Sequence, residues 1–197
     1  ILKGAIAIKP TSNDTTTVAI NGVKFDYSPV KKNSKTRCTP VIEVHNGNVG
    51  LRVSNCLIEN NTAGTDDRNA ADFKYLQNVF QMDSLASGSM VVENCVINLN
   101  AGCQIAVLAE AENSTVLLKD TKIQTAKDDK GNPKGNSDIG IFPHNNGVTV
   151  TMDNSTIELN NHYGIYMWSG DNKGSDLEKD EKPIKDLKVY LKNKSAI

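Results

Sequence analysis

Large aromatic rings are scarce in this chain: Phe, Tyr and Trp together make up 5% of its 197 residues, with a single Trp. Asn, Thr, Gly and Val are abundant instead, and that balance suits strands and turns more than packed helices. With 197 residues, 38% of them hydrophobic, the chain is long enough to bury a core. We therefore expect one all-β domain over residues 1–197, as part of a longer protein.

An excess of charge of one sign is also lacking. The 22 Lys and Arg residues are balanced by 23 Asp and Glu residues, for a net charge of -1. Without a basic excess the chain has no electrostatic reason to bind nucleic acid or an anionic membrane surface. No apolar run approaches the roughly 18 residues that a membrane-spanning helix needs. The sequence therefore predicts no nucleic-acid partner and no membrane span.

Cysteine and histidine are few, at four and three residues. No C-x-x-C pair occurs, which disfavours a structural zinc site, and no metal ligands are predicted. Cys56 and Cys95 stand in two nearly identical segments, V-S-N-C-L-I-E-N and V-E-N-C-V-I-N-L. We interpret them as small inward side chains of a repeat that share a column with Thr121 and Ser155. A disulfide between them stays open as the alternative.

The repeat runs along the whole chain. Its main frame is apolar-x-apolar-x-Asn/Asp, then two residues and Ile, with copies at 18–25 (shifted by one residue), 51–58, 90–97, 116–123, 150–157 and 189–193. A short apolar strand precedes each copy, at 4–8, 41–45, 79–83, 105–108, 139–142 and 164–168. Alternating apolar residues bounded by Asn, Gly and Asp predict pairs of short strands that meet at sharp corners.

Six strand pairs without intervening helices predict a parallel β-helix of about six coils. A β-sandwich is the alternative, because Asn21-Gly22 and Asn146-Gly147 are suited to hairpin turns. Only the β-helix accounts for all six copies. Irregular spacing places insertions at 28–39, 62–77, 125–137 and 169–183, with a short helix expected at Asp67–Leu76.

Two insertions contain acidic, Gly-containing segments, Asp128–Asn132 and Asp171–Asp176. They are similar to loose calcium loops but lack the ligand spacing of an EF-hand. We expect no cofactor, and calcium is the one that the sequence leaves open.

The motif V-x-N-C-x-I, preceded by a short apolar strand, resembles the right-handed repeat of the pectate-lyase-like superfamily. The resemblance covers nearly the whole chain and implies a right-handed, single-stranded parallel β-helix. That superfamily includes polysaccharide lyases, glycoside hydrolases, phage tailspikes and non-catalytic bacterial surface proteins. The Gly-Asp-Asp and Gly-His-Gly motifs of its polygalacturonases are missing here. Only Arg37, Arg52 and Arg68 are available for the Arg base of its pectate lyases.

Side chains alternate across a strand, so an alignment of the first strands predicts their outward residues. We align Ile8, Val44, Met82, Val107, Ile141 and Met167 as inward residues. One outward column is then Lys9, His45, Asp83, Leu108, Phe142 and Trp168, and the other is Ala7, Glu43, Gln81, Ala106, Gly140 and Tyr166. Trp168, Tyr166 and Phe142 would form a row of rings that stacks on sugar faces, unless an insertion or a partner covers them.

Glu43, His45 and Asp83 would lie on two stacked coils, within roughly 5 to 7 Å of one another. Two carboxylates at that separation can act as acid and base on a glycosidic bond. Ordinary solvated surface charge is the alternative for these residues.

The function expected from these features is glycan binding, without catalysis, by the outer face of a secreted or cell-surface bacterial protein. A polysaccharide lyase or glycoside hydrolase that uses Glu43, His45 and Asp83 on the same face is the alternative. A purely structural segment of an adhesin or fibre is the third possibility. It would need a protein partner or a neighbouring domain to cover the apolar ends at Ile1 and Ile197.

Overall fold

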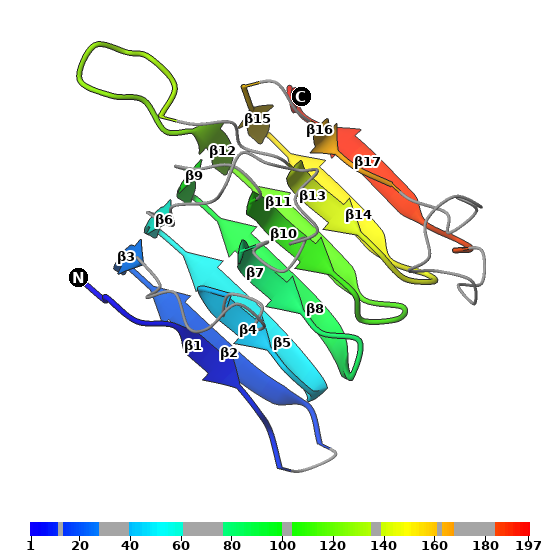
Figure 1. Cartoon of the computed structure of the whole chain (residues 1–197). Coiled ribbons are helices and arrows are strands. Elements are labelled where there is room, and N and C mark those ends of the chain that lie inside the picture. Colours follow the sequence, from blue (N-terminus) through cyan, green and yellow to red (C-terminus); the bar gives the residue numbers. More distant parts are fainter. Residues whose placement is uncertain are drawn as a thin grey trace, which may run out of the picture.

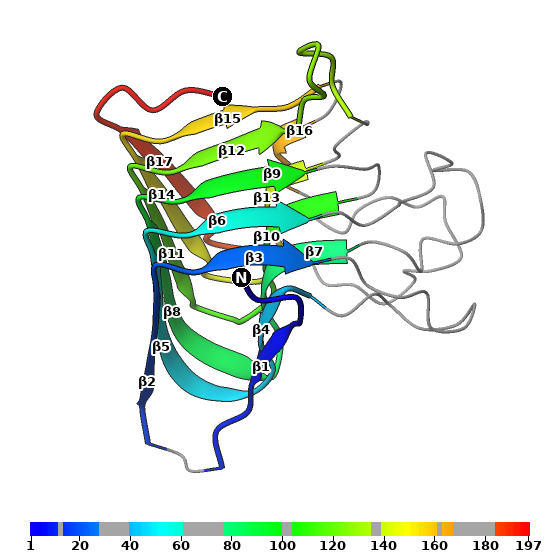
Figure 2. The same ribbon diagram turned by 90° about the vertical axis from the view of Figure 1, so that its left-hand side faces the viewer.

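The computed structural model describes residues 1–11, 14–27, 40–60, 77–99, 104–134, 139–160, 163–167 and 184–197. Its strands form three parallel sheets around a shared hydrophobic core, so the chain is a parallel β-helix (Figure 1). Figure 2 shows the strands of successive coils stacked one above another. The predicted all-β solenoid is confirmed, and among the described residues two of the sheets have six strands.

The strands belong to three sheets, named here I, II and III; each of the first five coils contributes to all three, and the described part of the sixth coil contributes to I and II. Sheet I contains β1 (Ile6–Ile8), β4 (Ile42–Val44), β7 (Gln77–Met82), β10 (Gln104–Ala109), β13 (Ile139–Pro143) and β16 (Tyr163–Ile165). Sheet II contains β2 (Thr16–Asn21), β5 (Gly47–Ser54), β8 (Ala86–Glu93), β11 (Thr115–Lys119), β14 (Thr149–Asp153) and β17 (Lys188–Lys192). Sheet III contains β3 (Lys24–Tyr27), β6 (Leu57–Asn60), β9 (Val96–Leu99), β12 (Lys122–Thr125) and β15 (Thr156–Glu158).

The prediction of two strands per coil was wrong, because the corner residue divides the main frame into two strands. Asn55, Asn94, Asp120 and Asn154 have φ values of 54°, 50°, 48° and 47°. This is the left-handed region, which Asn and Asp tolerate better than other residues with a side chain. The chain therefore turns from sheet II into sheet III at each of them. Gly22, with φ 69°, does the same in the first coil.

Side chains at this corner bond from coil to coil. The Nδ2 group of Asn94 donates to Oδ1 of Asn55 at 2.6 Å, and that of Asn55 donates to Oδ1 of Asn21 at 2.7 Å. Farther along, Asn154 donates to Oδ1 of Asp120 at 2.6 Å. The corner residues thus supply both the backbone turn and a polar ladder between coils.

The residue after the corner points inward and forms a second ladder. The backbone N–H of Cys56 donates to Sγ of Cys95 at 3.4 Å, and that of Cys95 donates to Oγ1 of Thr121 at 3.3 Å. The backbone N–H of Thr121 in turn donates to Oγ of Ser155 at 3.0 Å. The predicted column is confirmed, and both thiols are free. Burial raises the pKa of Cys95 to about 11.

The strand register of sheet I differs from the alignment at two steps. Met82 pairs with Ala109 and not with Val107, and Ile141 pairs with Ile165 and not with Met167. Each step is a slip of two residues. Alternation has a period of two, so the slip leaves inward residues inward but changes which outward residues are neighbours.

One predicted insertion is described in large part, at residues 125–134. Lys127 and Pro133 form an antiparallel bridge there. The Asp128 carboxylate accepts the backbone N–H groups of Lys130 and Asn132 at 2.9 and 2.8 Å, and the bonds from Asn132 lower its pKa most. The predicted helix at 67–76, the second acidic loop at 171–176 and the insertions at 28–39 and 169–183 lie outside the described residues. In the described part of the chain, no helix is long and apolar enough to cross a membrane.

Candidate functional site

The outward face of sheet I is accessible along the C-terminal ends of its strands, which we call the accessible edge of the sheet. Some residues that point outward by alternation are nevertheless buried, namely Val79, Gln81, Ala106 and Leu108. The outward residues at the ends of β4, β7, β10 and β13 are only half-buried. We call these the polar band: Glu43, His45, Asp83, Glu110 and His144.

Backbone hydrogen bonds between coils stack four members of the band in one column. The N–H of Asp83 donates to the carbonyl of Val44 at 2.9 Å. Val44 directly precedes His45, so Asp83 lies beside His45. In the same way, the N–H of Glu110 donates to the carbonyl of Met82 and the N–H of His144 donates to the carbonyl of Ala109, each at 2.8 Å. The predicted neighbours of Asp83 in this column, Leu108 and Phe142, were therefore wrong. Glu110 and His144 hold those places.

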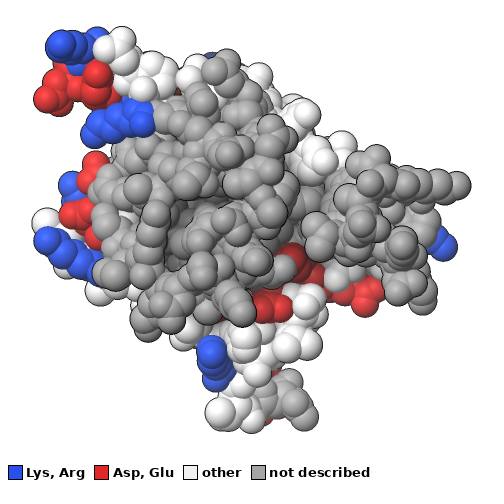
Figure 3. Space-filling view, viewed as in Figure 1, with Lys and Arg blue, Asp and Glu red and all other residues white. Residues whose placement is uncertain are grey.

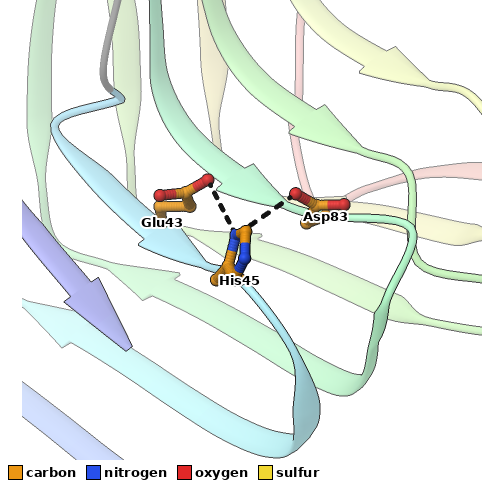
Figure 4. Close-up of side chains that lie close together, drawn as sticks. All are labelled: Glu43, His45 and Asp83. Atoms are coloured by element: carbon orange, nitrogen blue, oxygen red, sulfur yellow. Dashed lines mark hydrogen bonds and ion pairs between the residues drawn. The ribbon is translucent and has the colours of Figure 1, made fainter. Parts of the chain in front are cut away.

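Glu43, His45 and Asp83 converge at one end of the band (Figure 4). His45 Nδ1 lies 3.4 Å from Oε1 of Glu43 and 3.5 Å from Oδ2 of Asp83. The other oxygen of Asp83 accepts the Ser84 hydroxyl at 3.1 Å, which leaves Oδ2 toward His45. The three residues are thus closer than the alignment predicted, with potential ligand atoms within 4.8 Å of one another.

Glu110 and His144 form the middle of the band. The Glu110 carboxylate accepts the Gln81 side-chain amide at 3.2 Å, and its other oxygen lies 3.8 Å from His144 Nδ1. Asn145 donates to the backbone carbonyl of Glu110 at 2.7 Å. These bonds tie three successive coils together at the edge where the band is accessible.

Aromatic rings continue the face beyond His144. The Phe142 ring centroid lies 4.8 Å from that of His144 and 5.2 Å from that of Tyr166. Tyr163 lies 5.0 Å from Tyr166 and is 54% exposed. We call Phe142, Tyr163 and Tyr166 the aromatic cluster. The predicted columns were wrong at this step, because the slip places Tyr166, and not Trp168, beside Phe142. Tyr163 was not foreseen, and Trp168 lies outside the described residues.

Charge is distributed differently over the other sheets. On sheet II, Glu93 accepts hydrogen bonds from Lys119 at 2.7 Å and from Arg52, and the bond from Lys119 is the main cause of its lowered pKa. A hollow of about 430 Å³ beside Glu93 is lined by such paired groups. On sheet III, Lys24 pairs with Glu59 at 2.8 Å. Figure 3 shows acidic groups with few basic ones over the lower middle of the sheet I side, and mixed charges along the left edge.

Sequence reasoning missed Glu110 and His144, although a signal for both was present. His45, Asp83, Glu110 and His144 each lie ten or eleven residues before the corner Asn or Asp of their coil. An alignment counted back from the corner would have placed them in one column. Comparisons of the chain with protein-family models, with curated proteins and with solved structures found no match.

Proposed function

We propose that this chain is a secreted or cell-surface β-helix protein that binds a neutral glycan along the accessible edge of sheet I, without catalysis. The observation that carries the proposal is the continuity of two kinds of side chain on that edge. The aromatic cluster adjoins the polar band, with 4.8 Å between the rings of Phe142 and His144.

The two parts match the two surfaces of a sugar ring. The faces of a pyranose expose C–H groups, which pack on aromatic rings, and its rim carries hydroxyls. Carboxylates accept hydrogen bonds from hydroxyls, and imidazoles donate or accept them. Tyr163 and Tyr166 would take the faces of one sugar unit, and Glu110 and His144 the rim of the next.

The stacking of the coils makes the edge suited to an extended polymer. Neighbouring strands lie about 4.8 Å apart, so the four steps from His45 to Tyr166 span on the order of 19 Å. Every contact group stands on or directly beside a strand of sheet I. Binding therefore needs little ordering of the protein, which favours affinity.

Charge favours a neutral over an anionic polymer. Among the described residues of this edge, three carboxylates face one Lys, since Lys9 lies beside His45 in the register of β1 and β4. Without a bound cation, a polyuronate would be repelled by Glu43, Asp83 and Glu110. The same repulsion makes a lyase, which acts on uronate units, a poorer fit than a binding protein.

The proposal is tested by affinity electrophoresis in gels that contain neutral polysaccharides or polyuronates. We expect retardation by at least one neutral polymer, weakened roughly tenfold in Tyr166→Ala and at least as much in Trp168→Ala. Tyr190→Ala is the matched control, because Tyr190 is 46% exposed on sheet II. The proposal fails if no polymer retards the protein, or if the three variants behave alike.

Glycoside hydrolysis is the second candidate, because Glu43 and Asp83 approach the same atom of His45. Paired carboxylates of this kind can supply acid and base. Incubation with the retained polymer would then release reducing ends, and release would stop in Glu43→Gln and Asp83→Asn. Unsaturated products would instead identify a lyase.

A further inference from the structure

We propose that Glu43, His45 and Asp83 form a binding site for one divalent transition-metal ion, with Zn²⁺ as the representative ion. The site lies at the end of the polar band away from the aromatic cluster. The inference does not rest on the proposed function, and its test contains no glycan.

The two contacts at His45 are longer than good hydrogen bonds and match the spacing of ligands around a shared cation. The two carboxylate oxygens lie 3.4 and 3.5 Å from the same Nδ1 atom. Good N–H···O bonds measure about 2.7–3.2 Å, and one Nδ1 proton can serve only one carboxylate at a time. Two ligands bound to zinc at about 2.1 Å in tetrahedral geometry lie about 3.4 Å apart. Both observed separations therefore match the edges of a zinc coordination tetrahedron.

The two carboxylate oxygens must come within about 4.2 Å of each other to share one ion, since each would lie about 2.1 Å from it. All three potential ligand atoms lie within 4.8 Å of one another. The Glu43 and Asp83 carboxylates repel each other, and a cation between them removes that repulsion. Because Glu43 has three side-chain torsions, its oxygen can move the short distance to the ion without a change in the strand.

The backbone beneath the three residues is fixed by the β-helix. Glu43 lies in β4 and pairs with Gln81, while His45 and Asp83 follow the ends of neighbouring strands. The N–H of His45 donates to Ile8 at 3.0 Å, and that of Asp83 donates to Val44 at 2.9 Å. The Ser84 hydroxyl and, at 3.4 Å, the Leu85 N–H orient the Asp83 carboxylate from its other oxygen. Such bonds to the far oxygen of a ligand are typical of metal sites.

The donor set selects the class of ion. One imidazole nitrogen and two carboxylates suit Zn²⁺ and its transition-metal neighbours. Calcium takes six to eight oxygen ligands and magnesium about six, more than this cluster supplies. The His45 side chain is 37% exposed, so a three-ligand ion here keeps a coordination position for water or another ligand.

The test is calorimetric titration of the whole chain with Zn²⁺, after chelation and dialysis. We expect one ion per chain in the wild type, at least roughly 100-fold weaker binding in His45→Ala, and roughly tenfold or greater weakening in Asp83→Asn. Glu158→Gln is the matched control, because Glu158 is an exposed carboxylate on sheet III that pairs with Lys122 at 2.9 Å. Its affinity should equal that of the wild type.

Folding and ligand identity are checked on the same samples. Circular dichroism and thermal unfolding show whether each variant is folded, and Asp83→Asn keeps nearly the same shape as the native side chain. Loading with Co²⁺ should give ligand-field bands without a thiolate charge-transfer band. No wild-type binding, unchanged binding in folded His45→Ala and Asp83→Asn, tighter binding of Ca²⁺ than of Zn²⁺, or a thiolate band would each overturn the proposal.

Discussion

The corner between sheets II and III and the accessible edge of sheet I lie on the same coils but follow different rules. From the second coil to the fifth the same kinds of residue recur at the corner, with Asn or Asp at positive φ followed by a small inward side chain. At the edge the column changes from His45 to Asp83, Glu110 and His144. The corner must satisfy the backbone in every coil, whereas an outward side chain is free to differ. Positions that repeat from coil to coil therefore belong to the scaffold, and function is expected where the side chains differ between coils.

The largest expected effect is at a glycine close to the corner between sheets I and II. A Cβ at Gly88 would lie 2.3 Å from the carbonyl oxygen of Val49, and its φ is +113°. Gly88→Ala should therefore lower the free energy of unfolding by roughly 3–5 kcal/mol, from steric clash and backbone strain together. Gly50→Ala is the control, because its nearest neighbour would be 3.9 Å away. Urea unfolding measures both, and equal losses would contradict this account.

The next largest effect is a dependence of the free energy of unfolding on pH, caused by the buried thiol of Cys95. The pKa of Cys95 is raised from 9.0 to about 11 by burial, so the folded state keeps its proton where the unfolded state loses it. The stabilisation is complete below about pH 9 and is lost as the pH rises toward about 11.

Cys95→Ser isolates this contribution, because Ser155 already occupies an equivalent place in the ladder. The stability of the wild type relative to Cys95→Ser should fall by roughly 2 kcal/mol between about pH 8 and pH 11. Urea unfolding of reduced samples measures it. A stability difference that does not change with pH would show that the thiol titrates alike in both states.

A smaller effect is expected at a corner Asn, which both adopts the left-handed backbone and bonds to the next coil. Asn94→Ala loses the 2.6 Å bond to Asn55 and places Ala at a φ of 50°, so it should cost about 1–2 kcal/mol. Asn94→Gly loses the bond but tolerates the backbone, so it should cost less. Thermal unfolding ranks the two variants. A greater loss in Asn94→Gly would refute the backbone role.

The smallest effect is expected at the edge of sheet I. Tyr163→Ala should change the free energy of unfolding by about 0.5 kcal/mol or less, as exposed substitutions usually do. Glu43→Gln should have a similarly small effect, because the amide keeps the shape of the half-buried carboxylate. Urea unfolding measures both. A loss of several kcal/mol in either would mean that the edge belongs to the scaffold.

The same contrast explains how much the sequence could predict. The columns of Cys56 and Cys95 and the corner positions followed from the repeat, because the backbone imposes them in every coil. The third strand of the first five coils was missed because the corner residue is a single position within a continuous apolar frame. The membership of the polar band was missed in part, since a two-residue slip preserves alternation and leaves Glu110 and His144 outward in either register.

The central claim is that ligand recognition belongs to the edge of sheet I and not to the outer face of sheet II. It is tested most directly by backbone amide NMR of the whole chain, titrated with an oligosaccharide of the polymer that retards it. We expect chemical-shift changes at residues 43–45, 83–84, 108–110, 142–145 and 163–167, and none at the outward residues of β5, β8 and β14. Shifts confined to sheet II, or spread evenly over both sheets, would contradict it.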